Sequence, residues 1–380
     1  MGNSTWGASY MDLGVSPVIN AIGNVSILGG STPSPAVRKA IEEAHDAFVP
    51  MWDLARAAGE AVARMLGVEA AWITSGAASA ITLSAAACIA GDDGDRLRRL
   101  PDTTGMPNRI LIQKRQRYSY DRALELAGAK IVEVGTDDGT TEGRLTGAID
   151  SRTAAVHFLA DERIVDPRIL TFEQVLRIAH SKNVPLIVDA AGQVYPLENL
   201  SKYAKAGADF VCYGAKYIQS VHSTGFVCGS EKMISKLRLH SFVAFESLHL
   251  RSLGRPHKVD RQEIIGTVAA LREWLTMNHE ERLATLDART DAIAAHLRGI
   301  PGLKATPERQ TVGGSSYGLR LELDPAVAGK TLDDLVELLK GGDPPVWTRV
   351  IRGSMLIAVQ CLNEGEDDIV GRRIAEALRA

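Results

Sequence analysis

The segment Ile187–Gln193 reads IVDAAGQ, a short apolar strand that ends in an acidic residue, Asp189. The segment Asp209–Lys216 reads DFVCYGAK, a second short strand followed by a glycine turn and a lysine. The two segments lie about one strand–helix–strand unit apart, so parallel strands would bring Asp189 and Lys216 to the same edge of one sheet. Open α/β sheets bind their ligands at this carboxyl edge. The two segments therefore predict an α/β fold with a ligand site beside Asp189 and Lys216.

Short apolar strands alternate with amphipathic helices along most of the chain before residue 255. Apolar runs predict strands at 70–74, 109–113, 130–134, 154–159, 185–189, 209–212 and 226–229, and helices are predicted at 35–46, 52–67, 79–90, 121–128, 171–182 and 199–206. Such alternation is typical of a mostly parallel sheet that is covered by helices on both faces. The polar, turn-rich segment 91–107 is predicted to be a surface loop.

The pattern changes after Gly254. A long helical pattern covers about 261–299, and it is followed by short strands near 303–306, 316–323, 346–351 and 354–359 and by helices near 331–340 and 366–379. This mixture favours a smaller α+β domain. The chain has 380 residues, and single cores rarely grow beyond about 250–300 residues. We therefore expect two domains, with a boundary near residue 255.

A third segment, Thr74–Ser79, reads TSGAAS and joins a strand to a helix through small residues. Such a turn exposes backbone N–H groups at the positive end of the helix dipole, which suits a phosphate. Taken alone, Lys216 fits a surface lysine, Asp189 a helix N-cap and the turn a tight connection. Together they match one ligand, pyridoxal phosphate (PLP), whose aldehyde forms a Schiff base with lysine, whose pyridinium nitrogen pairs with a carboxylate and whose phosphate needs such a turn.

The composition excludes several classes of protein. Hydrophobic residues make up 45% of the chain and charged residues 23%, which excludes a wholly disordered protein. The formal net charge of −3 leaves no basic excess for binding nucleic acid. We find no signal peptide or membrane span, no HExxH metal motif and no GxGxxG, GxxxxGK[ST] or GxSxG motif. Four widely spaced cysteines without a CxxC pair favour reduced thiols and a cytoplasmic protein.

Several short segments together resemble one family across nearly the whole chain. They are PVINA at 17–21, TSGAA at 74–78, VDAAGQ at 188–193, GAK at 214–216, STG at 223–225, GRPHK at 254–258 and EIIG at 263–266. The chain is thereby similar to the SelA-like (selenocysteine synthase and D-glucosaminate-6-phosphate ammonia-lyase) group of fold-type-I PLP enzymes. The resemblance implies a large PLP-binding domain at 46–255 with a mostly parallel seven-stranded sheet, and a small α+β domain at 256–380. It also implies an N-terminal segment at 1–45 that packs on the small domain and on a partner subunit, and hence a homodimer or a higher homo-oligomer.

The resemblance also implies residue roles. Lys216 would form the Schiff base and then act as the base at Cα, while Asp189 would pair with the pyridinium nitrogen. The cofactor contacts that it implies are Ser75, Gly76, Ala77, Gln116, Asp189, Gln193, Tyr213, Lys216, Ser223 and Thr224. Positive charge for an anionic substrate would come from Arg255, Lys258 and Arg349. A surface position for the first two, and a structural ion pair for the third, are the alternatives.

Three positions depart from the family pattern. Gln116 stands where the family often has a histidine that stacks on the pyridine ring. Tyr213 replaces the small or hydroxyl residue three positions before the lysine, and Ser220-Val221-His222 replaces Gly-Pro-Gln. His222 is therefore a candidate second acid or base, although a turn residue held by hydrogen bonds is the plainer interpretation. These departures indicate a substrate unlike that of the better-known members.

The resemblance favours a PLP-dependent lyase that acts on an amino acid or an amino-sugar acid. An external aldimine and a Cα carbanion would lead to loss of a β-substituent such as water, and then to release of ammonia and a keto acid. Racemisation and transamination are the alternative reactions, and a catalytically silent PLP-binding protein is a further alternative. The acidic charge argues against transfer of selenium on tRNA.

Overall fold

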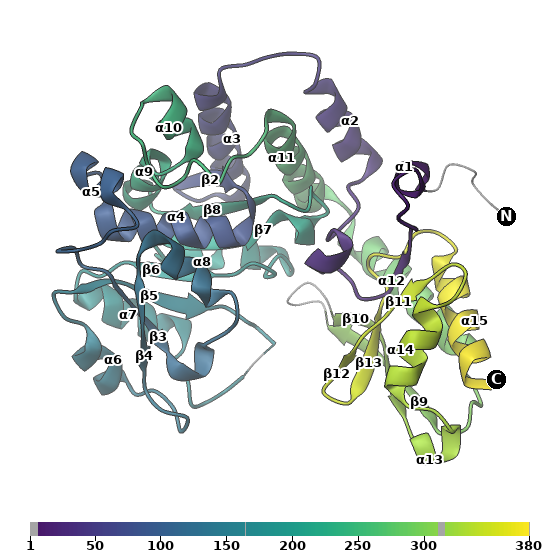
Figure 1. Ribbon diagram of the computed structural model, residues 1–380. Coiled ribbons are helices and arrows are strands. Elements are labelled where there is room, and N and C mark those ends of the chain that lie inside the picture. Colours follow the sequence, from purple (N-terminus) through teal and green to yellow (C-terminus); the bar gives the residue numbers. More distant parts are fainter. Residues whose placement is uncertain (1–6, 164, 311–315, 380) are drawn as a thin grey trace. The chain divides into compact units, whose positions relative to one another are not determined.

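The structure is a computed structural model that describes residues 7–163, 165–310 and 316–379. The chain divides into two compact units, one formed by Thr32–Thr276 and the other by Met1–Ser31 together with Met277–Ala380. Figure 1 shows both units in the colours of the sequence. The division lies between residues 276 and 277, whereas the sequence pattern places its change near residue 255. The reason is that α11 (Arg261–Thr276) packs against α2 (Pro35–Glu43) and α3 (Met51–Leu66) of the larger unit.

The larger unit contains a seven-stranded sheet, in agreement with the predicted fold class. Its strand order is β2-β8-β7-β6-β5-β3-β4, and β8 is antiparallel to both neighbours while the other pairs are parallel. The strands are β2 (Ala70–Thr74), β3 (Arg109–Gln113), β4 (Lys130–Val134), β5 (Thr153–Leu159), β6 (Leu186–Asp189), β7 (Phe210–Gly214) and β8 (Gly225–Gly229). Their side chains are mostly buried on both faces, as expected for a sheet between two helical layers.

Helices cover both faces of this sheet (Figure 1). One face carries α4 (Gly76–Ala90), which is buried nearly all round and therefore lacks a polar stripe. The opposite face carries α6 (Glu142–Ala148), α7 (Phe172–Ser181) and α8 (Lys202–Lys205). The remaining helical elements of the unit are α5 (Gly94–Arg99), η2 (Lys114–Gln116), η3 (Asp121–Ala127), η4 (Leu197–Leu200), η5 (Ala215–Ile218), α9 (Glu231–Leu239) and α10 (Phe242–Ser247).

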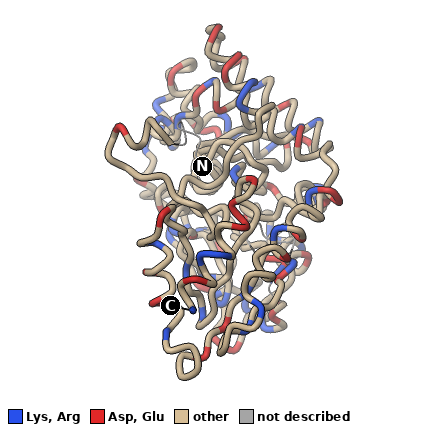
Figure 2. Tube along the Cα trace, turned by 90° about the vertical axis from the view of Figure 1, so that its right-hand side faces the viewer, with Lys and Arg blue, Asp and Glu red and all other residues tan. Residues whose placement is uncertain are grey.

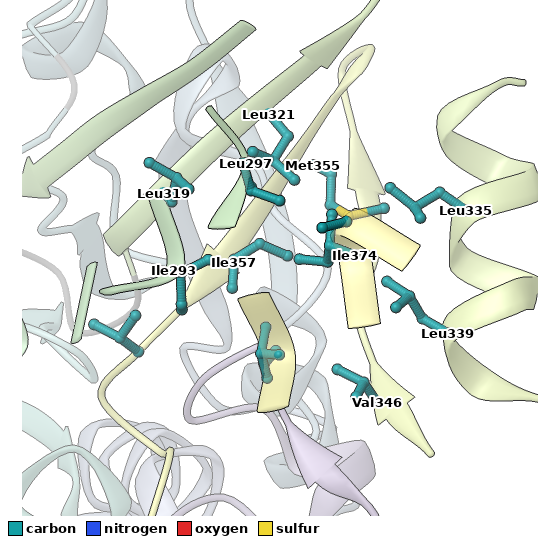
Figure 3. Packing of buried hydrophobic residues seen from close by; sticks show 14 of the residues in the cluster. Ile293, Leu297, Leu319, Leu321, Leu335, Leu339, Val346, Met355, Ile357 and Ile374 are labelled. Atoms are coloured by element: carbon teal, nitrogen blue, oxygen red, sulfur yellow. The ribbon is translucent and has the colours of Figure 1, made fainter. Parts of the chain in front are cut away.

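The smaller unit is built on an antiparallel sheet of order β12-β13-β10-β9 and a parallel pair, β1 with β11. Its strands are β1 (Ile19–Asn20), β9 (Leu303–Gln310), β10 (Ser316–Leu323), β11 (Val346–Trp347), β12 (Val350–Ile351) and β13 (Ser354–Ala358). Its helices are α1 (Ala8–Met11), η1 (Ser26–Leu28), α12 (His279–His296), α13 (Pro325–Ala328), α14 (Leu332–Lys340) and α15 (Glu366–Arg379). Figure 3 shows Leu319 and Ile357 from the sheet in one buried cluster with Ile293, Leu335 and Ile374 from the helices.

At two places a single polar side chain made the sequence prediction of secondary structure wrong. The helix expected over 261–299 is two helices, α11 and α12, because the side chain of Asn278 accepts hydrogen bonds from the N–H groups of Glu280 and Glu281 and so begins a new helix. The segment 91–107, expected to be a loop, contains α5, which Asp93 caps in the same way.

The described helices include none long and apolar enough to cross a membrane. In Figure 2 the acidic and basic positions are interspersed along the chain and do not gather by sign. This mixture agrees with the small net charge of −3.

A close backbone approach at the start of β8 yields a stability prediction. A Cβ on Gly225 would lie 2.5 Å from the carbonyl oxygen of Tyr213 and 2.6 Å from the carbonyl carbon of Gly76. We expect Gly225→Ala to lower the free energy of unfolding of the cofactor-free protein by about 1–3 kcal/mol, because backbone atoms must move to admit the methyl group. Urea unfolding measures the change.

Gly143→Ala is the matched control. Gly143 lies in α6 and a Cβ there would meet no atom within 4 Å, so alanine should leave stability unchanged or raise it by up to about 1 kcal/mol. Equal unfolding midpoints for the two variants would contradict the close approach at Gly225.

Candidate active site

Three turns meet at one edge of the seven-stranded sheet. Because β8 is antiparallel to β2 and β7, its first residue, Gly225, pairs with the last residue of each, Thr74 and Gly214. The turn that begins α4 and the turn that carries Lys216 therefore both lie beside the start of β8. The N–H of Ala215 donates to the carbonyl of Thr224 at 2.9 Å and fixes the second of these turns.

The end of β6 joins the same edge. The N–H of Gly214 donates to the carbonyl of Ala191, and the N–H of Ala190 donates to the carbonyl of Cys212, both at 3.0 Å. These bonds hold the turn after Asp189 against the end of β7. The sequence prediction that Asp189 and Lys216 follow neighbouring parallel strands is therefore confirmed.

Asp189 is buried at the end of β6. Its Oδ1 accepts the N–H of Ala191 at 3.0 Å, and its Oδ2 accepts the hydroxyl of Tyr118. Burial raises the pKa of Asp189 above its usual value, while the bonds from Tyr118 and from the N–H of Ala191 oppose that rise. The site therefore contains a carboxyl group whose charge depends on a small number of donors.

Lys216 lies in η5, half-buried, with Nζ 5.1 Å from the centre of the Tyr217 ring. His222 follows η5 and is also half-buried. Burial lowers the pKa of His222, and the positive charge of Lys216 lowers it further. The charge of Lys216 therefore disfavours the protonated form of His222.

A chain of hydroxyl groups begins at the N-terminus of α4. Ser75 precedes α4 and its side chain makes no capping bond to the helix. Its Oγ instead lies 2.8 Å from the Oγ of Ser79, which lies 2.8 Å from Nδ1 of His257. Sequence reasoning missed Ser79 and His257, although both lie in segments that it singled out, Thr74–Ser79 and 254–258.

The chain matches known proteins over nearly its whole length. The chain is 32% identical over 378 residues to a 5'-C-glycyluridine monooxygenase-decarboxylase from a Streptomyces species, a match that covers 97% of this chain and 92% of that protein. It is 29% identical to a D-glucosaminate-6-phosphate ammonia lyase from Salmonella typhimurium, with 97% of each chain covered. An L-seryl-tRNA(Sec) selenium transferase from Caldanaerobacter subterraneus is 26% identical over 66% of this chain and 58% of its own length.

The chain belongs to the SelA-like group of fold-type-I PLP enzymes. A solved structure of D-glucosaminate-6-phosphate ammonia-lyase superimposes with a TM-score of 0.84 at 28% identity and covers 98% of both chains. A search against family models returned no match. The predicted family, fold class and cofactor are thus confirmed, and PLP is the cofactor of this enzyme.

The residues present fit PLP. The amide oxygen of Gln193, four residues beyond β6, is buried and has no hydrogen-bond partner among the described residues. A buried acceptor without a partner is costly, so a donor from a bound molecule is expected there. Asp189 would hold the ring nitrogen, Lys216 the aldehyde carbon, and Ser75, Gly76 and Ala77 the phosphate.

Ser223 and Thr224 use their hydroxyl groups within the protein. Thr224 is buried and donates to the carbonyl of Val221 at 2.8 Å, while the exposed Ser223 donates to the carboxylate of Glu263. Both therefore stabilise the turn before β8. A contact of either with the cofactor phosphate stays a prediction.

Tyr213 lies on the opposite face of β7 from the site. Asp189 pairs with Cys212, and Cys212 faces α4, where its sulfur lies 3.8 Å from the hydroxyl of Ser84. Because successive side chains of a strand point to opposite faces, Tyr213 faces away. Its hydroxyl donates to the carbonyl of Asn199 at 2.8 Å and its ring packs on Phe226. The structure thus uses Tyr213 for packing under the sheet, which explains why a bulky residue is accepted at this position.

Gln116 is buried in η2, and its amide is already paired. Its Nε2 donates to the carbonyl of Leu159 at 3.0 Å, and its Oε1 accepts from Nε2 of Gln113 at 3.2 Å. Its expected position over the pyridine ring stays a prediction. The same stretch instead delivers Tyr118 to Asp189, a contact that sequence reasoning missed because it assigned the ring partner to position 116.

The three predicted substrate-binding cations differ in their surroundings. Arg255 is exposed and forms an ion pair with Glu246. Lys258 is exposed. Arg349 belongs to the smaller unit, so its substrate role remains a prediction.

The hydroxyl chain at α4 yields a binding prediction. Ser79→Ala removes the link between Ser75 and His257, so the dissociation constant for PLP should rise about tenfold as a hydrogen bond near the phosphate is weakened. Binding of pyridoxal, which lacks the phosphate, should be unchanged. Equilibrium titration of the cofactor-free protein measures both constants.

Ser235→Ala is the control, because the hydroxyl of Ser235 on α9 bonds only to a carbonyl of its own helix among the contacts described. Equal weakening of PLP and pyridoxal by Ser79→Ala would show that Ser79 acts through the fold and not through the phosphate.

Proposed function

We propose that this enzyme is a PLP-dependent ammonia lyase that acts on a β-hydroxy amino acid or amino-sugar acid. The observation that carries the proposal is the full-length likeness to D-glucosaminate-6-phosphate ammonia lyase in both sequence and fold. It is supported by the meeting of Asp189, Lys216 and the turn at Ser75 at one sheet edge.

The cofactor, when bound, withdraws the electron pair that remains at Cα after the proton is removed. Nζ of Lys216 is the base that takes this proton. Asp189 holds a negative charge at the end of β6, where it favours a protonated ring nitrogen. His222, half-buried and coupled to Lys216, is the proposed carrier of a second proton to the departing hydroxyl group.

The net reaction balances without an oxidant. The substrate loses its Cα proton and its β-hydroxyl group, which leaves as water, and the resulting enamine becomes an imine that one water molecule hydrolyses. The products are a 2-keto acid and ammonia. Positive charge for an acidic substrate is proposed to come from Lys258 and Arg349, with Arg255 available if it leaves Glu246.

A second candidate is oxidative decarboxylation of an amino acid, because the 32% identical relative carries the name monooxygenase-decarboxylase. That reaction needs dioxygen and releases carbon dioxide, whereas the lyase reaction uses no dioxygen and releases no carbon dioxide. Racemisation would invert the substrate without release of ammonia, and transamination would require an acceptor keto acid.

Incubation of the PLP-loaded enzyme with D- and L-β-hydroxy amino acids and amino-sugar acids tests these reactions. We expect ammonia and keto acid to form in equal amounts, and at the same rate under nitrogen as under air. Turnover that requires air and releases carbon dioxide would favour the second candidate, and inversion without ammonia would contradict both.

Lys216→Ala tests the assigned base. We expect the variant to lose all turnover and the visible absorbance of the lysine–cofactor linkage. In the wild type, borohydride reduction should attach the cofactor permanently to Lys216, where it serves as a label. Lys205→Ala, on the exposed side of α8, is the matched control and should retain both. A reduced label on a different lysine would exclude the proposed role of Lys216.

We further propose a cytoplasmic homodimer. The four cysteines are free thiols in the structure, as suits a reducing compartment. Fold-type-I sites are typically completed by a second subunit, as the family resemblance implied. Sedimentation velocity should therefore show at least two copies per particle.

A further inference from the structure

The hydroxyl of Tyr118 lies between two buried groups, Asp189 and His157. Tyr118 lies between η2 and η3, His157 on β5 and Asp189 at the end of β6. The hydroxyl oxygen is 3.1 Å from Nε2 of His157 and donates to Oδ2 of Asp189. The rings of Tyr118 and His157 are nearly parallel, at 6°.

The protein positions all three groups firmly. Ile187 pairs with His157 in the sheet, so His157 and Asp189 point to the same face. Asp121 accepts the backbone N–H of Tyr118 at 3.2 Å and an Nε–H bond from Arg117 at 2.5 Å. The segment between η2 and η3 is thereby anchored, with the hydroxyl of Tyr118 at the carboxylate of Asp189.

The number of available protons fixes which group donates and which accepts in the hydrogen bonds that link His157, Tyr118 and Asp189. A phenol has one proton, and Tyr118 keeps it, because burial and the charge of Asp189 raise the pKa of Tyr118 far above its usual range. If that proton is donated to Asp189, the hydroxyl oxygen can only accept from His157. His157 must then carry its proton on Nε2. Burial lowers the pKa of His157 to about 4, so the ring is neutral and Nδ1 carries no proton near neutral pH.

The reverse direction is less favourable. It would require a protonated Asp189 that donates to Tyr118, and a Tyr118 that donates to Nε2 of His157. The proton of the histidine would then sit on Nδ1, which is buried and has no partner among the described residues. An unpaired buried N–H costs more than an unpaired imidazole lone pair, so the chain runs from His157 through Tyr118 to Asp189.

We propose that His157 and Tyr118 form a donor chain that keeps Asp189 ionised and so prepares it for the pyridinium nitrogen of PLP. Both are positioning residues, since they act through Asp189. The inference rests on the PLP class of the enzyme and not on the lyase reaction.

Other charged groups near Asp189 do not replace this chain. Cys212 on β7 faces the same side, but burial, followed by the charge of Asp189, raises the pKa of its thiol well above the usual value. Asp121 on η3 is paired with Arg117. From α4 the uncharged Ser84 contacts Cys212. The thiol of Cys88, also on α4, has a pKa that burial raises well above the usual value. In this part of the structure Tyr118 and the N–H of Ala191 are the donors to the carboxylate.

Tyr118→Phe tests the chain, because phenylalanine keeps the ring and removes the hydroxyl. The probe is 4-deoxypyridoxine 5'-phosphate, which keeps the ring nitrogen and phosphate but cannot bond covalently to Lys216. Loss of the donor should raise the pKa of Asp189, so more of it is protonated at a given acidic pH. The midpoint for loss of probe binding at acid pH should therefore rise by about one to two pH units.

Titration of the probe itself is the same in every variant, so the difference between proteins isolates the carboxylate. Tyr120→Phe is the matched control, because Tyr120 is 72% exposed and its variant should keep the wild-type midpoint. An unchanged or lowered midpoint in Tyr118→Phe, or an equal rise in both variants, would overturn the proposal.

A second test uses nitrogen NMR of the cofactor-free wild type with labelled histidine. It does not depend on whether any variant binds the probe. The signal of His157, identified by its loss in His157→Gln, should be that of a neutral ring protonated on Nε2. A ring protonated on Nδ1 would reverse the chain and refute the proposal.

Discussion

The pairing of Gly225 with Thr74 on one side and Gly214 on the other is the constraint on which the active site depends. It arises because β8 is the one antiparallel strand of the seven-stranded sheet. A strand that enters in the opposite direction begins where its neighbours end. The turn at Ser75 before α4, the turn that carries Lys216 and the turn before β8 are therefore brought together by backbone pairing alone. The absence of a side chain at Gly225 allows the backbones of Gly76 and Tyr213 to approach.

The second constraint is the burial of charge. Asp189 lies in a place that disfavours its ionised form, and its proposed role with PLP requires that form. The protein resolves this conflict with donors that come from other parts of the chain, namely Tyr118 and the N–H of Ala191. Around Lys216 the conflict concerns His222 instead, because burial and the positive charge of Lys216 both disfavour its protonated form. Asp189 and Lys216 thus have different neighbours that influence charge.

Much of the larger unit could be predicted from the sequence because its signals are local. β3 and β4 begin and end where the apolar runs do, and Asp189 and Lys216 follow strands that pair side by side. The errors arose where a single polar side chain decides the outcome. Asn278 divides a continuous helical pattern, and Asp93 begins a helix within a polar segment. Such caps are worth only about 1 kcal/mol each, too little to stand out in a periodic pattern.

The sequence by itself predicted the cofactor, which the comparisons confirm, and it pointed to a lysine, a carboxylate and a turn for the phosphate, because each of these is encoded within a few adjacent residues. Tertiary structure decided what surrounds them. Tyr118 and His157 reach Asp189 from two other segments, and His257 reaches Ser79 from far along the chain. The register of β7 with β6 turned Tyr213 away from the site, although its sequence position is next to it. Contacts across distant segments depend on strand order and on the face of each strand, and neither is written in the spacing of neighbouring residues.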